Sequence, residues 1–127
     1  MKITELNFND KEPIYHQIIE FVKKSVALGA LNAGDKLPSV REMSQALGVN
    51  PNTLQRAYGE LERIEITYTK RGKGSYIRED EDGISKLRDE MAKEIIEKFF
   101  EDMKSIGVDK KAAMRMISER ENREWLN

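Results

Sequence analysis

Residues 39–58 read SVREMSQALGVNPNTLQRAY, and their spacing predicts two short helices joined by a tight turn. Ser39 with Glu42 three positions later forms a capping box, which marks the start of the first helix, and a following glycine marks its end. Asn50 and Pro51 suit the N-cap and first position of the second helix. Because only three residues separate the two helices and one of them is glycine, the stretch predicts a helix-turn-helix.

The flanking sequence supplies the other parts of a winged helix-turn-helix. Residues 13–28 carry one apolar stripe at helical spacing and end before a glycine. Residues 66–77 alternate between apolar and polar around an Arg-Gly-Lys-Gly turn at 71–74, which predicts a β-hairpin. Together these elements predict an α+β, mostly helical DNA-binding domain over residues 1–78. The side chains of the paired helices expected to face its core are Val40, Met43, Leu47, Leu54, Ala57, Tyr58 and Leu61.

A second part of the chain follows an acidic stretch, residues 79–83, which we expect to be a linker. Apolar residues then recur every three or four positions from Ile84 to Ile106, which predicts an amphipathic helix of about six turns. A last helix is expected after Asp109, and its apolar candidates are Ala113, Met116, Ile117 and Trp125. Since such a stripe is too apolar to leave in water, residues 84–127 are predicted to form a short C-terminal two-helix dimerisation tail. The predicted dimer contacts are Leu87, Met91, Ile95, Phe99 and Met103.

Composition limits the classes of function. The net charge is −1, but residues 1–78 carry 12 basic and 9 acidic residues, whereas 79–127 carry 10 and 14. The basic excess on the first part suits a nucleic-acid partner. There is no cysteine, and no apolar run approaches the roughly 20 residues of a membrane helix. We therefore expect a cytoplasmic protein without a membrane partner.

The residue sets of enzymes are missing from the sequence. His16 is the only histidine, and it has no neighbouring ligands with which to build a catalytic triad or a metal site. The glycine turn at 71–74 is not a nucleotide-binding loop, because it is not followed by Gly-Lys-Ser/Thr at the start of a helix. We expect no enzymatic activity, no metal and no cofactor.

The helix that begins at Pro51 carries the side chains best suited to reading DNA bases. A recognition helix presents its leading residues to the major groove. Asn and Gln can bind adenine through two hydrogen bonds, and Arg can bind guanine in the same way. The predicted contacts on this helix are Asn52, Thr53, Gln55 and Arg56. The alternative is that they are ordinary exposed helix positions.

Two further groups of basic residues are candidates for DNA contact. Arg41 lies near the start of the preceding helix, within reach of a phosphate or a guanine edge; alternatively it pairs with Asp35 or Glu42. In the hairpin turn, glycines allow close backbone approach to a minor groove and cations supply attraction. The candidates there are Arg71, Gly72 and Lys73, and the alternative is an ordinary glycine turn.

Taken in order, these motifs resemble the GntR family of bacterial regulators. The resemblance covers about residues 13–78 and rests on Pro-Ile-Tyr at 13–15, Gly-Asp-Lys-Leu-Pro-Ser-Val-Arg-Glu at 34–42, Leu-Gly-Val-Asn-Pro-Asn-Thr at 47–53 and the Arg-Gly-Lys-Gly turn. The Asn-Pro-Asn-Thr form and the short tail resemble the YtrA-type branch. The resemblance implies a repressor that binds palindromic operators as a homodimer. It also implies operator contacts at Arg41, Asn52, Thr53, Gln55, Arg56, Arg71 and Gly72.

The sequence departs from this family at two positions. Glu65 stands where the family usually has a glycine with positive φ, so it must adopt that conformation or end the helix differently. Gly59 stands where a larger polar residue is common.

Two functional questions stay open at the level of sequence. The main alternative to a DNA-binding regulator is a winged-helix protein-interaction module, against which the cationic turn and the polar helix argue. A small-molecule effector would have to bind at the dimer interface, because two helices are too few to enclose a drug-sized pocket within one protomer.

Overall fold

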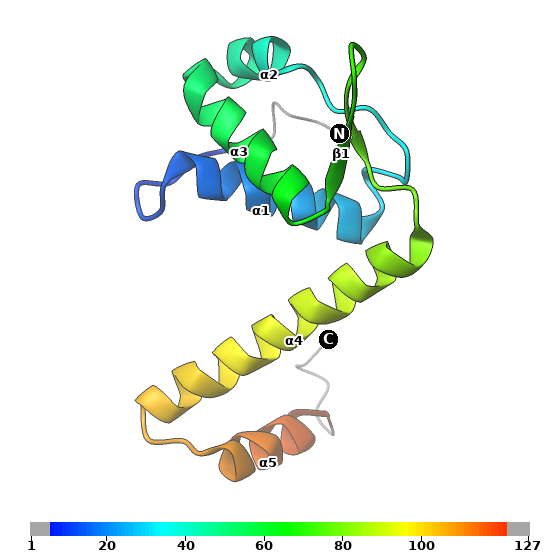
Figure 1. Cartoon of the computed structure of the whole chain (residues 1–127). Helices are drawn as coiled ribbons and strands as arrows, with labels where there is room; N and C mark the ends of the chain where they lie inside the picture. The colour runs from blue at the N-terminus through cyan, green and yellow to red at the C-terminus, as the bar shows by residue number, and fades with distance from the viewer. Residues whose placement is uncertain (1–5, 122–127) are drawn as a thin grey trace. The chain divides into compact units, whose positions relative to one another are not determined.

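The computed structural model describes residues 6–121, so the predicted contribution of Trp125 lies outside the described part. The chain divides into two compact units, residues 1–87 and 88–127, and the division falls within a helix. The order of the elements along the chain is shown in Figure 1. They are α1 (Ile14–Leu28), α2 (Val40–Leu47), α3 (Pro51–Arg63), β1 (Thr67–Lys70), β2 (Gly74–Ile77), α4 (Glu81–Ser105) and α5 (Lys110–Glu121).

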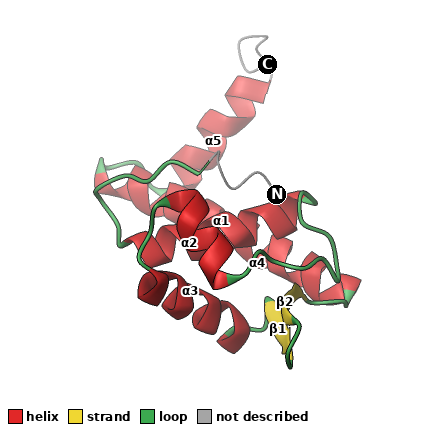
Figure 2. Cartoon of the chain, turned by 90° about the horizontal axis from the view of Figure 1, so that it is seen from above, coloured by secondary structure: helices red, strands yellow, loops and turns green. Residues whose placement is uncertain are grey.

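The first unit packs α1, α2 and α3 around one apolar core, with the hairpin at the end of α3 (Figure 2). The capping box at Ser39 is present, and Asn50 caps α3 ahead of Pro51, so both predicted helix starts are confirmed. The expected first helix is shifted slightly, because Pro13 occupies the cap position of α1 rather than its first turn. The largest fully buried side chains are Ile18, Val22, Val26, Leu37, Met43, Leu54, Leu61 and Ile77.

A buried tyrosine joins α3 to the segment before α2. The Tyr58 hydroxyl donates a hydrogen bond of 2.6 Å to the carbonyl oxygen of Pro38. Burial raises the pKa of Tyr58, which keeps the hydroxyl protonated as a donor. This bond and the shared core fix the angle between α2 and α3.

The hairpin is extended on one side by the loop before α2. β1 and β2 pair antiparallel, with Tyr68 opposite Tyr76 and Lys70 opposite Gly74. Along the other edge of β2, the amide of Leu37 donates to the Ser75 carbonyl at 2.9 Å, and Lys36 forms a bridge with Tyr76. The predicted hairpin is therefore confirmed, and this loop attaches it to the helices.

The acidic stretch after the hairpin is more ordered than the linker that we expected. α4 begins at Glu81, so the last three residues of the expected linker at 79–83 are already helical. Gly83, Ile84 and Leu87 are the buried residues of α4, and Leu87 is only 8% exposed. The prediction that Leu87 lies on a dimerisation surface does not fit this burial. The sequence could not separate Leu87 from the exposed residues of the stripe, because they share the same helical spacing.

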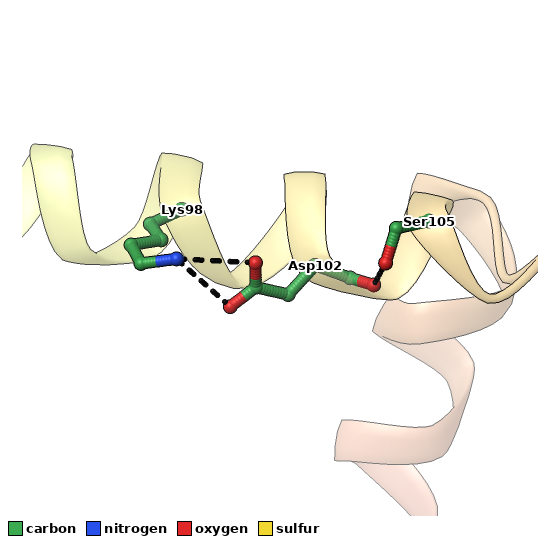
Figure 3. Close-up of polar contacts among 3 residues, drawn as sticks. All are labelled: Lys98, Asp102 and Ser105. Atoms are coloured by element: carbon green, nitrogen blue, oxygen red, sulfur yellow. Dashed lines mark hydrogen bonds and ion pairs between the residues drawn. The ribbon is translucent and has the colours of Figure 1, made fainter.

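The second unit contains the rest of α4 and α5. Gly107, with a φ of +84°, follows the end of α4. At the start of α5, an Asp109 carboxylate oxygen accepts a hydrogen bond of 2.8 Å from the Ala112 amide. The polar side of α4 is tied locally: the Lys98 ammonium contacts both carboxylate oxygens of Asp102, at 3.2 and 3.3 Å (Figure 3). No helix of the described chain is long and apolar enough to cross a membrane.

Candidate nucleic-acid interface

The leading end of α3 presents polar side chains away from the core. The side-chain oxygen of Asn50 accepts a hydrogen bond of 2.8 Å from the Asn52 amide, which fixes the first turn. Asn52 and Gln55 are exposed, and Thr53 is half-buried, while Leu54 on the opposite side is fully buried. Among residues 6–121, the side chains of Asn52 and Gln55 make no hydrogen bond. Their amide groups are therefore free to pair with base edges.

Arg56 is held by a neighbouring helix rather than extending freely. Its guanidinium carbon lies 3.8 Å from the centre of the Tyr15 ring, on α1. Such stacking on an aromatic face is favourable and restricts the side chain without neutralising it. Arg56 therefore lies on the α1 side of α3, while Asn52 and Gln55 are exposed at its leading end.

Arg41 is exposed near the start of α2. Within the described part of the chain it forms neither a hydrogen bond nor an ion pair, so the alternative pairing with Asp35 or Glu42 is not observed. Asp35 instead accepts from the Asn32 amide at 2.8 Å. The hydrogen bond from the Ser39 backbone, together with the Ser39 hydroxyl, lowers the pKa of Glu42. The carboxylates of Asp35 and Glu42 are thus both engaged in hydrogen bonds from backbone amides. The Arg41 guanidinium is therefore available for a contact with DNA.

The tip of the hairpin is a cationic turn. Arg71, Gly72 and Lys73 are all exposed, and Gly72 has a φ of +75°, a conformation that glycine adopts without strain. The Lys73 amide closes the turn with a 2.8 Å bond to the carbonyl of Lys70. The turn has the exposure and charge that a minor-groove or phosphate contact requires.

Aromatic side chains stiffen one face of this hairpin. The rings of Tyr68 and Tyr76 stack with their centres 5.9 Å apart, and the Lys70 ammonium lies 4.4 Å from the Tyr76 ring centre. A cross-strand aromatic pair of this kind stabilises a two-stranded hairpin. The wing is thus braced where it leaves the helices.

Sequence analysis missed two residues at this surface. Tyr15 was not singled out, because its contact with Arg56 joins residues 41 positions apart. Lys36 was also missed: its exposed side chain lies against the wing, where a Cβ added at Gly74 would stand 3.1 Å from the Lys36 Cε. A basic residue within the Gly-Asp-Lys-Leu-Pro loop was the only available signal. The described residues contain no group of three or more acidic or histidine side chains that could hold a metal.

Comparison with known proteins decides the family. The model of the bacterial regulatory proteins of the gntR family matches residues 14–77, which include α1, the helix-turn-helix and the hairpin. The chain belongs to the GntR family. As a GntR-family protein it is a DNA-binding transcription regulator, and α3 is the second helix of its helix-turn-helix. The family and the relatives below are transcription regulators, not enzymes.

For one individual regulator the similarity extends beyond the winged domain. The chain is 41% identical over 110 residues to the HTH-type transcriptional regulator YhcF of Bacillus subtilis, covering 87% of this chain and 91% of YhcF. It is 52% identical over 68 residues to the B. subtilis repressor YtrA, covering 54% of this chain and 52% of YtrA. These relatives support the YtrA-type branch.

Solved structures of GntR proteins match the fold. A GntR regulator from Listeria monocytogenes superimposes with a TM-score of 0.79 at 43% identity, covering 88% of this chain and 98% of that one. The DNA-binding domain of AraR in complex with operator ORX1 matches with a TM-score of 0.51 at 25% identity, covering 57% of this chain and 92% of that one. The AraR structure was thus solved in complex with DNA.

Proposed function

We propose that this GntR regulator is a repressor that binds a palindromic operator as a homodimer. The observation that carries the proposal is the capped leading end of α3, where the Asn52 and Gln55 side chains are exposed and make no hydrogen bond within the described chain. Each protomer would place this end in one major groove and the turn at 71–73 on the adjacent minor groove or phosphates. Repression is supported by the similarity to YtrA, which is a transcriptional repressor. This function implies a cytoplasmic protein.

The second unit supports homodimer formation through its apolar surface. Ile95 is 67% exposed and Phe99 is 39% exposed. An open groove of about 480 Å³ lies between α4 and α5, lined mainly by Phe99, Met103, Ala113, Met116 and Ile117. A contiguous apolar surface of this kind is costly in water, and a second copy would cover it. The proposed contact surface keeps the predicted Met91, Ile95, Phe99 and Met103 and omits the buried Leu87.

The groove also bears on the proposed effector. Its volume is within the range of small-molecule pockets, which is larger than we expected for two helices of a single protomer. Because the groove lies on the surface proposed for dimerisation, an effector bound there would share that surface with the second copy. Binding of a small molecule at the dimer interface stays a proposal.

The dimer proposal is tested by Ile95→Glu, which puts a charge into the proposed contact. We expect sedimentation analysis to show a dimer for the unaltered chain and a monomer for this variant. Lys93→Glu, at an exposed position of the same helix, is the control and should remain dimeric. A dimeric Ile95→Glu protein, or a monomeric unaltered chain, would contradict the proposed surface.

The proposed DNA contacts are tested by Arg56→Ala. We expect a loss of about 1–3 kcal/mol in binding to a duplex selected by the unaltered protein from a random library. Arg63→Ala is a matched control on the same helix, since Arg63 lies in the last turn and is paired with Glu60 at 2.8 Å. Equal affinities for Arg56→Ala and the unaltered chain, measured by fluorescence anisotropy, would remove Arg56 from the interface. A protein-interaction module would select no duplex.

A further inference from the structure

The hairpin has a buried face and an outward face. Thr67 and Ile77, which pair across the two strands, are both buried. Because side chains alternate between the two faces of a strand, the next pair, Tyr68 with Tyr76, lies on the outward face. Lys70 lies on this face as well, and its ammonium group is 4.4 Å from the centre of the Tyr76 ring and 5.7 Å from that of Tyr68. The aromatic pair thus holds the charge of Lys70 beside the tip of the hairpin.

A second lysine reaches the outward face from the loop before α2. This loop runs along the free edge of β2, where the Ile77 amide donates to the Asp35 carbonyl at 2.8 Å. Lys36 forms an antiparallel bridge with Tyr76, which puts the two side chains on the same face. The Lys36 Cε lies 3.1 Å from the point that a Cβ on Gly74 would occupy, so the alkyl chain of Lys36 crosses the backbone of β2 next to the tip.

The positive charges of this surface have no acidic partner. We call the surface the wing face, and its exposed cations are Lys36, Lys70, Arg71 and Lys73. None of them forms an ion pair with any residue of the part of the chain that the structure describes. Like charges gathered in this way repel one another, and an anion bound among them relieves the repulsion.

The two carboxylates nearest to this surface in contact terms are already engaged by hydrogen bonds. Glu79 accepts from the Tyr68 hydroxyl at 2.6 Å. Glu42, which interacts electrostatically with Lys36, accepts from the Ser39 amide at 3.1 Å within the capping box of α2. Both lysine ammonium groups of the wing face are therefore left for an external anion.

We propose that Lys36 and Lys70 bind a phosphate of the DNA backbone, beside the contact proposed for the turn at 71–73. Lys36 approaches from the loop edge and Lys70 from β1, and lysine binds phosphate as a point charge. The backbone bridge fixes the base of Lys36 and the tyrosine rings restrain Lys70, so less side-chain entropy is lost on binding. The inference rests on the proposed contact of the hairpin with DNA, and it needs only residues of the first unit.

A phosphate contact has a signature that base reading and fold stability lack. Each neutralised phosphate releases condensed counterions, so its loss lowers the slope of log affinity against log salt by about one. Phosphate contacts carry no sequence information, so the affinity should fall equally on every duplex.

The test measures this slope for the full chain by fluorescence anisotropy at several salt concentrations. The duplexes are the one selected by the unaltered protein and a scrambled one. We expect Lys36→Gln and Lys70→Gln each to lower the magnitude of the slope by about one for each bound protomer, on both duplexes. Lys36→Arg keeps the charge and should keep the slope. Lys24→Gln removes the same charge from an exposed position of α1 and should leave the slope unchanged.

Lys73→Gln, at the tip, separates the failure of this inference from that of the proposed function. An unchanged slope for Lys36→Gln or Lys70→Gln, with a lowered slope for Lys73→Gln, would overturn the lysine pair and keep the hairpin on DNA. Unchanged slopes for all three would remove the hairpin from DNA, and the inference with it. A loss confined to the selected duplex, or an equal change of slope for Lys24→Gln, would also overturn the phosphate contact.

Discussion

A single residue after α3 carries backbone strain. Glu65 has a φ of +64°, the only positive φ of a non-glycine residue in the described chain. Its amide donates to the Glu62 carbonyl, and the next amide donates to the Leu61 carbonyl, so both hydrogen bonds of the helix end depend on this conformation. A side chain in this region costs about 1 kcal/mol or more, and the hydrogen bonds that lead the chain into β1 offset it.

Replacement of Glu65 by glycine should relieve this strain. We expect Glu65→Gly to raise the free energy of unfolding by up to about 1 kcal/mol, less the entropy that glycine adds to the unfolded chain. Urea denaturation followed by circular dichroism measures the change. Glu62→Gly, at an exposed position inside the helix, should instead lower the free energy of unfolding by about 1 kcal/mol. A destabilised Glu65→Gly protein would show that the Glu65 side chain has a role beyond the turn.

At the residue scale, local sequence predicted what depends on near neighbours and missed what depends on distant ones. The caps at Ser39 and Asn50 could be read from residues three positions or fewer away. The stacking of Arg56 on Tyr15 could not, because it depends on how α1 and α3 pack. The strain at Glu65 was foreseen as one of two outcomes, and the structure selects it.

At the element scale, α2 depends on its capping box. The Glu42 carboxylate accepts from the Ser39 amide at 3.1 Å, and the Ser39 hydroxyl accepts from the Glu42 amide at 3.0 Å. Two amide donors that the helix cannot satisfy are paired in this way. Since α2 has only eight residues, its packing on α3 relies on a well-formed first turn.

The capping box predicts a pH dependence of stability. Because the hydrogen bond from the Ser39 backbone lowers the pKa of Glu42 in the folded state below its ordinary value of 4.5, the contribution of Glu42 to stability is complete above that pH. It is lost as the pH falls through the folded pKa. Unfolding free energies of the unaltered chain and Glu42→Ala, measured by urea titration from pH 7 to pH 3, should differ most at pH 7 and converge in acid. A difference that stays constant across this range would show that the carboxylate charge does not support the cap.

The ends of the helices could be predicted from glycines in the sequence, whereas the start of α4 depends on side-chain contacts that the sequence does not reveal. Gly29, Gly48 and Gly107 each end a helix in a left-handed conformation, as their positions in the sequence indicated. The start of α4 was placed too late, because four acidic residues at 79–82 resembled a solvated linker. Arg78 pairs with one of these acids and Tyr68 with another, and neither contact is visible from composition.

At the scale of the whole molecule, the winged domain and the surface proposed for dimerisation lie in different units of the chain. The first unit carries the winged domain, and the second carries exposed apolar residues between two helices. Dimerisation would bring a second copy of α3 to a second half-site of the operator. Binding both half-sites at once would raise the affinity for the operator. The amphipathic stripe of the tail was readable from sequence, whereas the burial of Leu87 required the tertiary packing.

In the proposed function, Gln55 and its neighbours read DNA bases from the leading end of α3. Fluorescence anisotropy of the unaltered chain and Gln55→Ala, on the selected palindrome and on a scrambled duplex at one salt concentration, tests this directly. We predict a loss of about 1–3 kcal/mol for Gln55→Ala on the palindrome and almost none on the scrambled duplex, since base contacts carry specificity and phosphate contacts do not. Equal affinities of the two proteins for the palindrome, or equal losses on both duplexes, would contradict the account.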